Sequence, residues 1–117
     1  MRRQLAQLRP SGTSAVSLFS PSGHYPYNVD LIVATNNSGA SVDVTIYHDV
    51  DGTTYDDTTC VLATTSLANG GTLYYSPGNG KVTGLSDYRA AGNIAVKTST
   101  ADSVNFTAYG VVEGERL

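Results

Sequence analysis

The chain has 117 residues, of which 40% are hydrophobic and only 15% are charged. This length allows one domain with a single core, and the low charge argues against both a disordered chain and a helical bundle. Only four basic residues, against all ten acidic ones, follow residue 9. An acidic body of this kind is not expected to present the basic surface patch that binds the phosphates of nucleic acid. The longest apolar run, Leu31 to Ala34, is too short to cross a bilayer.

Residues 1–13 are predicted to form an arm, followed by a domain that spans 14–117. Two leucines three residues apart permit one helical turn, which Pro10 and Gly12 would end. A turn this short is not stable by itself, so we expect the arm to be held by another part of the protein or by another subunit. Its predicted contact residues are Arg2, Arg3, Leu5, Leu8 and Arg9.

From residue 14 the pattern changes to short strands separated by turns rich in Gly, Pro and Asn. The segment 41–49 alternates apolar and polar residues with a period of two, which is typical of a half-buried strand. An Asp-Gly turn at 51–52 is expected to begin a hairpin. The predicted strands are 15–19, 28–35, 41–49, 53–55, 58–64, 72–76, 81–85, 93–98 and 103–112, with a turn at 77–80 and a loop at 88–92.

Strands of this length, with a turn about every ten residues, are typical of a sandwich or a small barrel. No helix of ordinary length is interleaved, which argues against a parallel α/β sheet. We therefore predict an all-β fold, namely a jelly-roll-like β-sandwich of eight or nine short antiparallel strands with an extended N-terminal arm.

The sequence contains few residues that could carry chemistry. Cys60 is the only cysteine, so no internal disulfide can form, and we expect a small buried apolar residue. His24 and His48 lack zinc-binding spacing, although His48 shares the apolar face of its strand. No Gly-x-Ser-x-Gly motif occurs. We therefore expect neither an enzyme nor a cofactor, and we assign no catalytic residue.

The segment Asp49-Val50-Asp51-Gly52 is the best candidate for a metal site. Calcium loops place oxygen ligands at alternate positions and use a glycine to turn the chain. Here Thr53 takes the place of the third acidic residue, and no Glu closes the loop. A solvated hairpin turn is therefore the preferred interpretation, and calcium binding by Asp49 and Asp51 is the alternative.

The chain has eight tyrosines, and Tyr74 and Tyr75 are adjacent in one predicted strand. Neighbouring residues of a strand face opposite ways, so one of this pair is expected to point outward. Exposed tyrosine suits contact with carbohydrate or protein. The simpler interpretation is that tyrosine fills a half-buried β surface.

From Leu18 to Gly110 the order of motifs resembles that of small virion proteins of tailed bacteriophages. These motifs are Leu18-Phe19 before Pro21-Ser22-Gly23, the apolar strand and turn at 31–39, the Ile-Tyr-His-Asp strand and Asp-Gly turn at 46–52, the segments 92–96 and 98–101, and the closing Tyr109-Gly110. They consist of turns and core positions, and the first dozen residues are not part of the resemblance.

The resemblance implies a structural protein of the virion, assembled in the host cytoplasm. Its partners would be capsid or other virion proteins, with no nucleic acid and no membrane. Our first expectation is a capsid decoration (cement) protein that binds and stabilises neighbouring capsid subunits. A homo-oligomer is expected, and a trimer would suit the three-fold sites of capsids. The alternatives are a neck, adaptor or tail-fibre component, or a carbohydrate-binding β-sandwich module.

Overall fold

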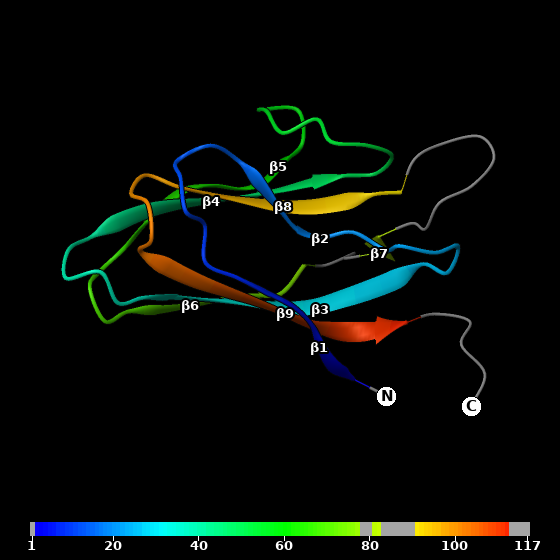
Figure 1. Ribbon diagram of the computed structural model, residues 1–117, viewed down its shortest axis with the longest axis horizontal. Coiled ribbons are helices and arrows are strands. Elements are labelled where there is room, and N and C mark those ends of the chain that lie inside the picture. The colour runs from blue at the N-terminus through cyan, green and yellow to red at the C-terminus, as the bar shows by residue number, and fades with distance from the viewer. Residues whose placement is uncertain (1, 78–80, 83–90, 113–117) are drawn as a thin grey trace.

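The computed structural model describes residues 2–77, 81–82 and 91–112, and every regular element among them is a strand (Figure 1). All of the strand pairs are antiparallel. The strands are β1 (Arg3–Leu8), β2 (Val16–Phe19), β3 (Tyr27–Asn36), β4 (Val42–Asp49), β5 (Cys60–Leu67), β6 (Thr72–Tyr75), β7 (Lys81–Val82), β8 (Asn93–Thr98) and β9 (Val104–Val112).

The strands form two layers that pack face to face (Figure 1). One sheet has the order β1-β9-β3-β6, with the short β7 beside β3, and the other has the order β2-β8-β4-β5. The chain passes from one sheet to the other after β1, β2, β3, β5, β7 and β8, which interleaves the strands as in a jelly roll. The predicted fold class, an all-β jelly-roll-like sandwich, is therefore confirmed.

The core lies between the two sheets and follows from the period-two pattern of their strands. In β4, Val42, Val44 and Ile46 face inward, and each is at most 2% exposed. Phe106 on β9 is the largest fully buried side chain. The other fully buried hydrophobic side chains above the size of alanine are Val29, Ile32, Val82, Ile94, Val96 and Val104.

The predicted hairpin at Asp51-Gly52 is wrong. β4 and β5 do pair with each other, but residues 50–59 form a longer connection and the predicted strand at 53–55 is absent. The physical reason is that this connection is held by its own bonds. The Asp49 carboxylate accepts from the backbone N–H of Thr54 at 2.7 Å, and the Thr59 hydroxyl donates to the Thr54 carbonyl at 2.7 Å.

The helical turn that the spacing of Leu5 and Leu8 permits does not form, because residues 3–8 form β1 alongside β9. The pairing has a register shift between Gln4 and Ala6, where a β-bulge reverses the alternation of side chains. Leu5 and Leu8, at an odd spacing, can therefore both pack against the core. Within this chain, the segment expected to be an arm is an edge strand of the sandwich.

Some predictions fall partly outside the described residues. They are the turn at 77–80, most of the strand at 81–85 and most of the loop at 88–92, of which the structure describes Pro77, β7 and residues 91–92. The strand predicted at 93–98 matches β8, and the ends of the other matching strands that are fully described differ by at most three residues, which is close to the usual scatter of such boundaries.

Candidate functional site

The predicted contact residues of the first segment lie on the outermost strand of one sheet. Among the described strands β1 pairs only with β9, in the order β1-β9-β3-β6, so within this part of the chain its other side is an open sheet edge. Such an edge presents backbone N–H and C=O groups that another strand can pair with. β1 also contacts β2, the outermost strand of the opposite sheet.

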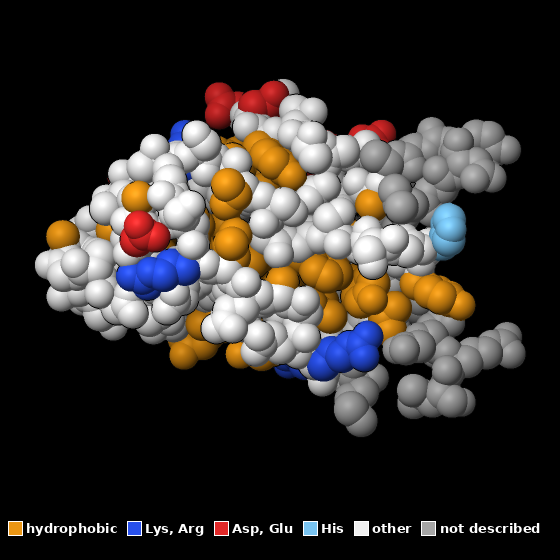
Figure 2. Space-filling model, viewed as in Figure 1, with side chains coloured by type: hydrophobic (Ala, Val, Ile, Leu, Met, Phe, Trp, Pro, Cys, Tyr) orange, Lys and Arg blue, Asp and Glu red, His pale blue; other side chains and the backbone are white. Residues whose placement is uncertain are grey.

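Hydrophobic side chains gather in a band between the two sheets on the face that Figure 2 shows. In the same view β1 and β2 cross in front of their sheets (Figure 1). Both strands carry half-buried hydrophobic residues that pack against the core, namely Leu5, Ala6, Leu8, Val16 and Phe19. The edge formed by β1 and β2 is therefore partly apolar and partly accessible.

Arg2 and Arg3 are exposed at the start of β1. The Nε atom of Arg2 lies 3.8 Å from a carboxylate oxygen of Asp30, and their side chains are 55% and 37% exposed. An exposed pair at this distance contributes little to stability. The Arg2 guanidinium can therefore exchange this partner for a carboxylate on another molecule.

The guanidinium of Arg9, another of the predicted contact residues, is bound within the chain. It donates to Asn37 Oδ1 at 2.7 Å, to Asn105 Oδ1 at 3.1 Å and to the carbonyl of Asp102. The neighbouring Pro10 carbonyl accepts from the backbone N–H of Asp102 at 2.9 Å. Arg9 thus fastens the end of β1 to the turn between β8 and β9. The sequence gives no signal for this role, because the partners lie far along the chain.

The Asp-rich connection after β4 acts as a structural loop in this conformation. Asp49 is buried, and its carboxylate accepts a hydrogen bond from the backbone N–H of Thr54, which holds the loop in place. Asp51 is exposed. Asp56 Oδ1 accepts from the N–H and the hydroxyl of Thr58, and these bonds lower the pKa of Asp56. Across 2–77, 81–82 and 91–112, no three His, Cys, Asp or Glu side chains gather closely enough to hold a metal ion.

The same connection partly covers the solvent-facing side of the sheet β2-β8-β4-β5. The ring of Tyr55 lies 6.2 Å from that of Tyr47 on β4. Burial raises the pKa of Tyr47, and the nearby Cys60 and Asp57 raise it further. The pKa of Tyr55 is also raised by burial, against a smaller lowering by its hydrogen bond with Ser17.

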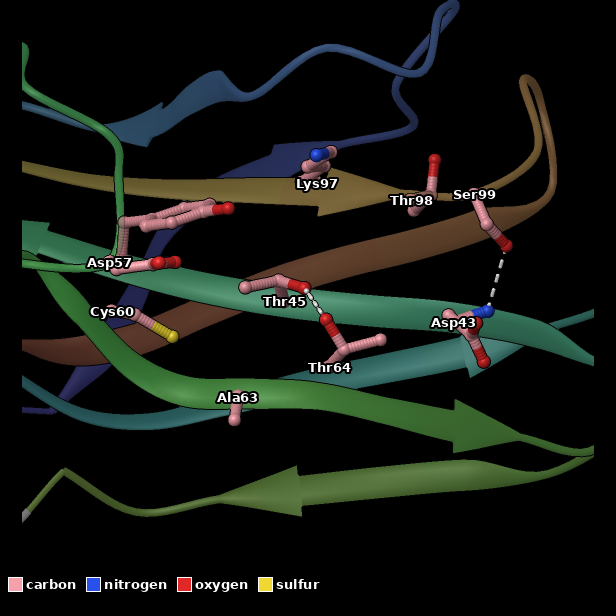
Figure 3. Close-up of a pocket in the computed structure, with 10 residues that line it drawn as sticks. Asp43, Thr45, Asp57, Cys60, Ala63, Thr64, Lys97, Thr98 and Ser99 are labelled. Atoms are coloured by element: carbon pink, nitrogen blue, oxygen red, sulfur yellow. Dashed lines mark hydrogen bonds between the residues drawn. The ribbon is translucent and has the colours of Figure 1, made fainter.

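Beside this aromatic pair the sheet is hollowed into an open pocket of about 340 Å³. Figure 3 shows Asp57 and Cys60 at one end, Asp43 and Ser99 at the other, and Thr45 between them. Cys60, expected to be buried in the core, is instead half-buried and lines this pocket, because its side chain lies on the outer side of β5. The sequence gives no sign of this pocket, because its residues come from three strands and two connections that are far apart along the chain.

The prediction that one of the adjacent tyrosines points outward is confirmed. Tyr74 is 70% exposed, while Tyr75 is half-buried, packs against the core and donates its hydroxyl to the Val61 carbonyl at 3.1 Å. His24 is exposed. His48 is half-buried and lines, with Ile46 and Ile94, a cavity of about 140 Å³ near the core, in line with the position expected for it.

The two interleaved sheets give the chain a jelly-roll-like fold, so proteins with this fold are the ones with which it can be compared. No family model matches the chain, and a comparison with curated proteins finds no match. No helix in the described part of the chain has the length and apolar character needed to cross a membrane.

Solved structures with a similar fold include chains of infectious bursal disease virus. One, from the Gx strain, has a TM-score of 0.52 and 15% identity, over 99% of this chain and 33% of the viral chain. Another, from the crystal structure of the T13 IBDV viral particle, has a TM-score of 0.52 and 15% identity, over 97% of this chain and 31% of the other. The chain spans about a third of the length of these viral chains. At this identity the likeness shows the fold alone.

Proposed function

We propose that this protein is a structural component of a virus particle, and specifically a decoration protein of a tailed-phage capsid. The observation that carries the proposal is the edge formed by β1 and β2. It combines an open sheet edge, half-buried hydrophobic residues and the exposed Arg2 and Arg3. The jelly-roll fold, which also occurs in chains of a viral particle, supports the proposal.

The mechanism of attachment is adhesion by a rigid body. Apolar surface along β1 and β2 is removed from water against a capsid subunit, which favours association. Arg2 and Arg3 pair with carboxylates of that subunit, which fixes the orientation and speeds the encounter. Residues 1–13 act as the docking segment in this proposal, and 14–117 as the body. We extend the proposal to a homo-oligomer, with a trimer as the arrangement that suits a three-fold site.

The first experiment measures how many copies each purified particle contains, by quantitative mass spectrometry. A decoration protein is expected at an abundance comparable with that of the capsid subunit. A few copies per particle would contradict decoration and favour the neck, adaptor or fibre role instead. Complete absence from the particle would overturn the whole proposal.

The second experiment tests the contact residues by adding recombinant protein to particles that lack it. The double variant Arg2→Ala/Arg3→Ala should bind at least about tenfold more weakly, because charge-assisted contacts across an interface are lost. Lys97→Ala, which removes a positive charge from the other sheet, is the control and should bind normally. Equal binding by the double variant and the wild type would exclude the proposed role of these arginines.

A further inference from the structure

The open pocket on the sheet β2-β8-β4-β5 is built by irregular pairing between β4 and β5. Two register shifts occur there, between Val44 and Ile46 and between Ile46 and Tyr47. Bulges of this kind re-aim side chains and often lie next to binding sites. Here Thr64 points outward beside Thr45, and their hydroxyl oxygens lie 3.2 Å apart (Figure 3). Thr45 is only 7% exposed although it lies on the solvent-facing side of the sheet.

Hydrogen bonds fix the end of the pocket that Asp43 and Ser99 form. The backbone N–H of Asp43 donates to the Ser99 hydroxyl at 2.9 Å, and the Asp43 carbonyl accepts from the Ser99 N–H at 3.0 Å. These bonds use the backbone of Asp43 and leave its carboxylate exposed. The site is therefore held in place before any ligand arrives, which lowers the entropic cost of binding.

The charged side chains of the pocket have no strong partners of their own. Lys97, Asp43 and Asp57 are all exposed, and among the described residues none of them takes part in an ion pair within 4.0 Å. Carboxylates only accept hydrogen bonds, an ammonium group only donates them, and threonine hydroxyls do both. The pocket thus offers acceptors at both ends and a donor from β8, over a floor of hydroxyl groups (Figure 3).

From this arrangement we infer that the pocket binds a neutral hexose unit of a glycan. Sugar hydroxyls donate and accept, so one ring can satisfy the carboxylates, the ammonium group and the threonine hydroxyls together. The volume of about 340 Å³ lies at the lower end of the range for small-molecule sites. Two carboxylates against one ammonium group disfavour phosphates and acidic sugars. This inference stands apart from the proposed role in the virion.

Cys60 provides a direct measure of occupancy, because it lines the pocket and is the only cysteine in the chain. The probes are the methyl glycosides of glucose, galactose and mannose, with methyl glucuronide as the acidic comparison. We expect at least one neutral glycoside to slow alkylation of Cys60 in a saturable way. The same glycoside should give saturation-transfer signals in NMR. If none of the neutral glycosides does either, or if the glucuronide binds better, the inference is overturned.

Variants then locate the site. Asp57→Ala and Lys97→Ala change exposed side chains, and each should weaken glycoside binding about tenfold by removing a hydrogen bond to a charged group. Tyr74→Ala is the matched control, because Tyr74 is 70% exposed on β6 of the other sheet. Unchanged melting temperatures show that the variants fold. Binding that survives both pocket variants, or that is lost in Tyr74→Ala, would place the sugar elsewhere and refute the inference.

Discussion

Asn36 is fully buried at the end of β3, and its side chain links three segments of the chain. Its amide nitrogen donates to the Ala40 carbonyl at 2.7 Å and to the Leu67 carbonyl at 2.8 Å. Its Oδ1 atom accepts from the N–H of Ser38 at 3.0 Å and from the Ser38 hydroxyl at 2.8 Å. A buried polar side chain with every bond made holds a turn in one conformation.

We expect Asn36→Ala to lower the free energy of unfolding by about 2–3 kcal/mol, because the bonds of its buried amide are lost and the buried Leu67 carbonyl loses this donor. Chemical denaturation with urea measures the change. Ser41→Ala, in the same turn but exposed, is the control and should stay within about 0.5 kcal/mol of the wild type. A loss below about 1 kcal/mol in Asn36→Ala would show that water replaces these bonds.

Arg9 illustrates how an exposed residue can hold the fold together. Its guanidinium bonds to Asp102 in the turn between β8 and β9, to Asn105 on β9 and to Asn37 after β3. We expect Arg9→Ala to lower the free energy of unfolding by about 1–2 kcal/mol, again by urea denaturation. Gln7→Ala, an exposed position on β1 two residues before Arg9, should have little effect. Equal effects of the two substitutions would contradict the anchoring role of Arg9.

At the scale of an element, β1 closes one end of its sheet. Leu8 pairs with Phe106, whose side chain is fully buried, so β1 covers this part of the core. Deleting residues 1–8 would remove Leu5 and Leu8, expose the part of the core against which they pack, and make β9 the edge of its sheet. We expect a loss of about 3 kcal/mol or more in stability, from the leucine contacts together with the pairing of the strand.

Hydrogen exchange tests this expectation, because the β9 amides that β1 now covers should lose protection in the deletion variant. The amides of β4 and β8 lie in the other sheet and serve as the internal control. Unchanged protection of β9 would mean that β1 does not contribute to the isolated domain.

The contact between β3 and β9 depends on a glycine at one point. A Cβ atom added at Gly110 would lie 2.0 Å from the Asn28 carbonyl oxygen and 2.9 Å from its carbon. Backbone atoms cannot move aside as a flexible side chain can, so we expect Gly110→Ala to cost about 3 kcal/mol or more. Gly23→Ala, where a Cβ would meet nothing within 4 Å, is the control. Thermal unfolding of both variants checks the prediction, which equal melting temperatures would refute.

At the scale of the whole molecule, the two raised tyrosine pKa values predict how stability depends on pH. Burial is the main cause of both shifts, for Tyr47 and for Tyr55, from an ordinary value of 10.0. Above this value the unfolded chain binds fewer protons than the folded protein, so stability falls as pH rises. Below pH 10.0 both tyrosine rings are neutral in the folded and the unfolded state, and their contribution to stability is fully present.

We therefore expect the free energy of unfolding to decrease as pH rises from about 10 upward. Tyr47→Phe should make this decrease shallower, because it removes one of the two groups. Tyr74→Phe changes an exposed ring and should leave the pH profile unaltered. Urea denaturation at a series of alkaline pH values provides the measurement. Identical pH profiles for the wild type and both variants would show that Tyr47 does not cause the decrease in stability.

Several features could be predicted from the sequence because they depend on local patterning. Alternation along 41–49 and 93–98 identified β4 and β8 almost to the residue, since a strand with one buried face must repeat with a period of two. The conformation of the connection after β4 could not be predicted from such local patterning. This conformation depends on the bonds that Asp49 and Thr59 make to Thr54. The Asp-Gly pair carries no information about these bonds.

The sequence by itself determined the class of fold, the alternation of buried and exposed side chains along 41–49 and the outward position of one of two adjacent tyrosines. These follow from the alternation of strands and from the places where glycine, proline and asparagine interrupt them. Only the tertiary structure decided that residues 3–8 join a sheet, that Arg9 is an anchor and that a polar pocket lies beside Thr45. Each of these depends on partners distant in sequence, and such pairings are fixed only when both sheets close around their common core.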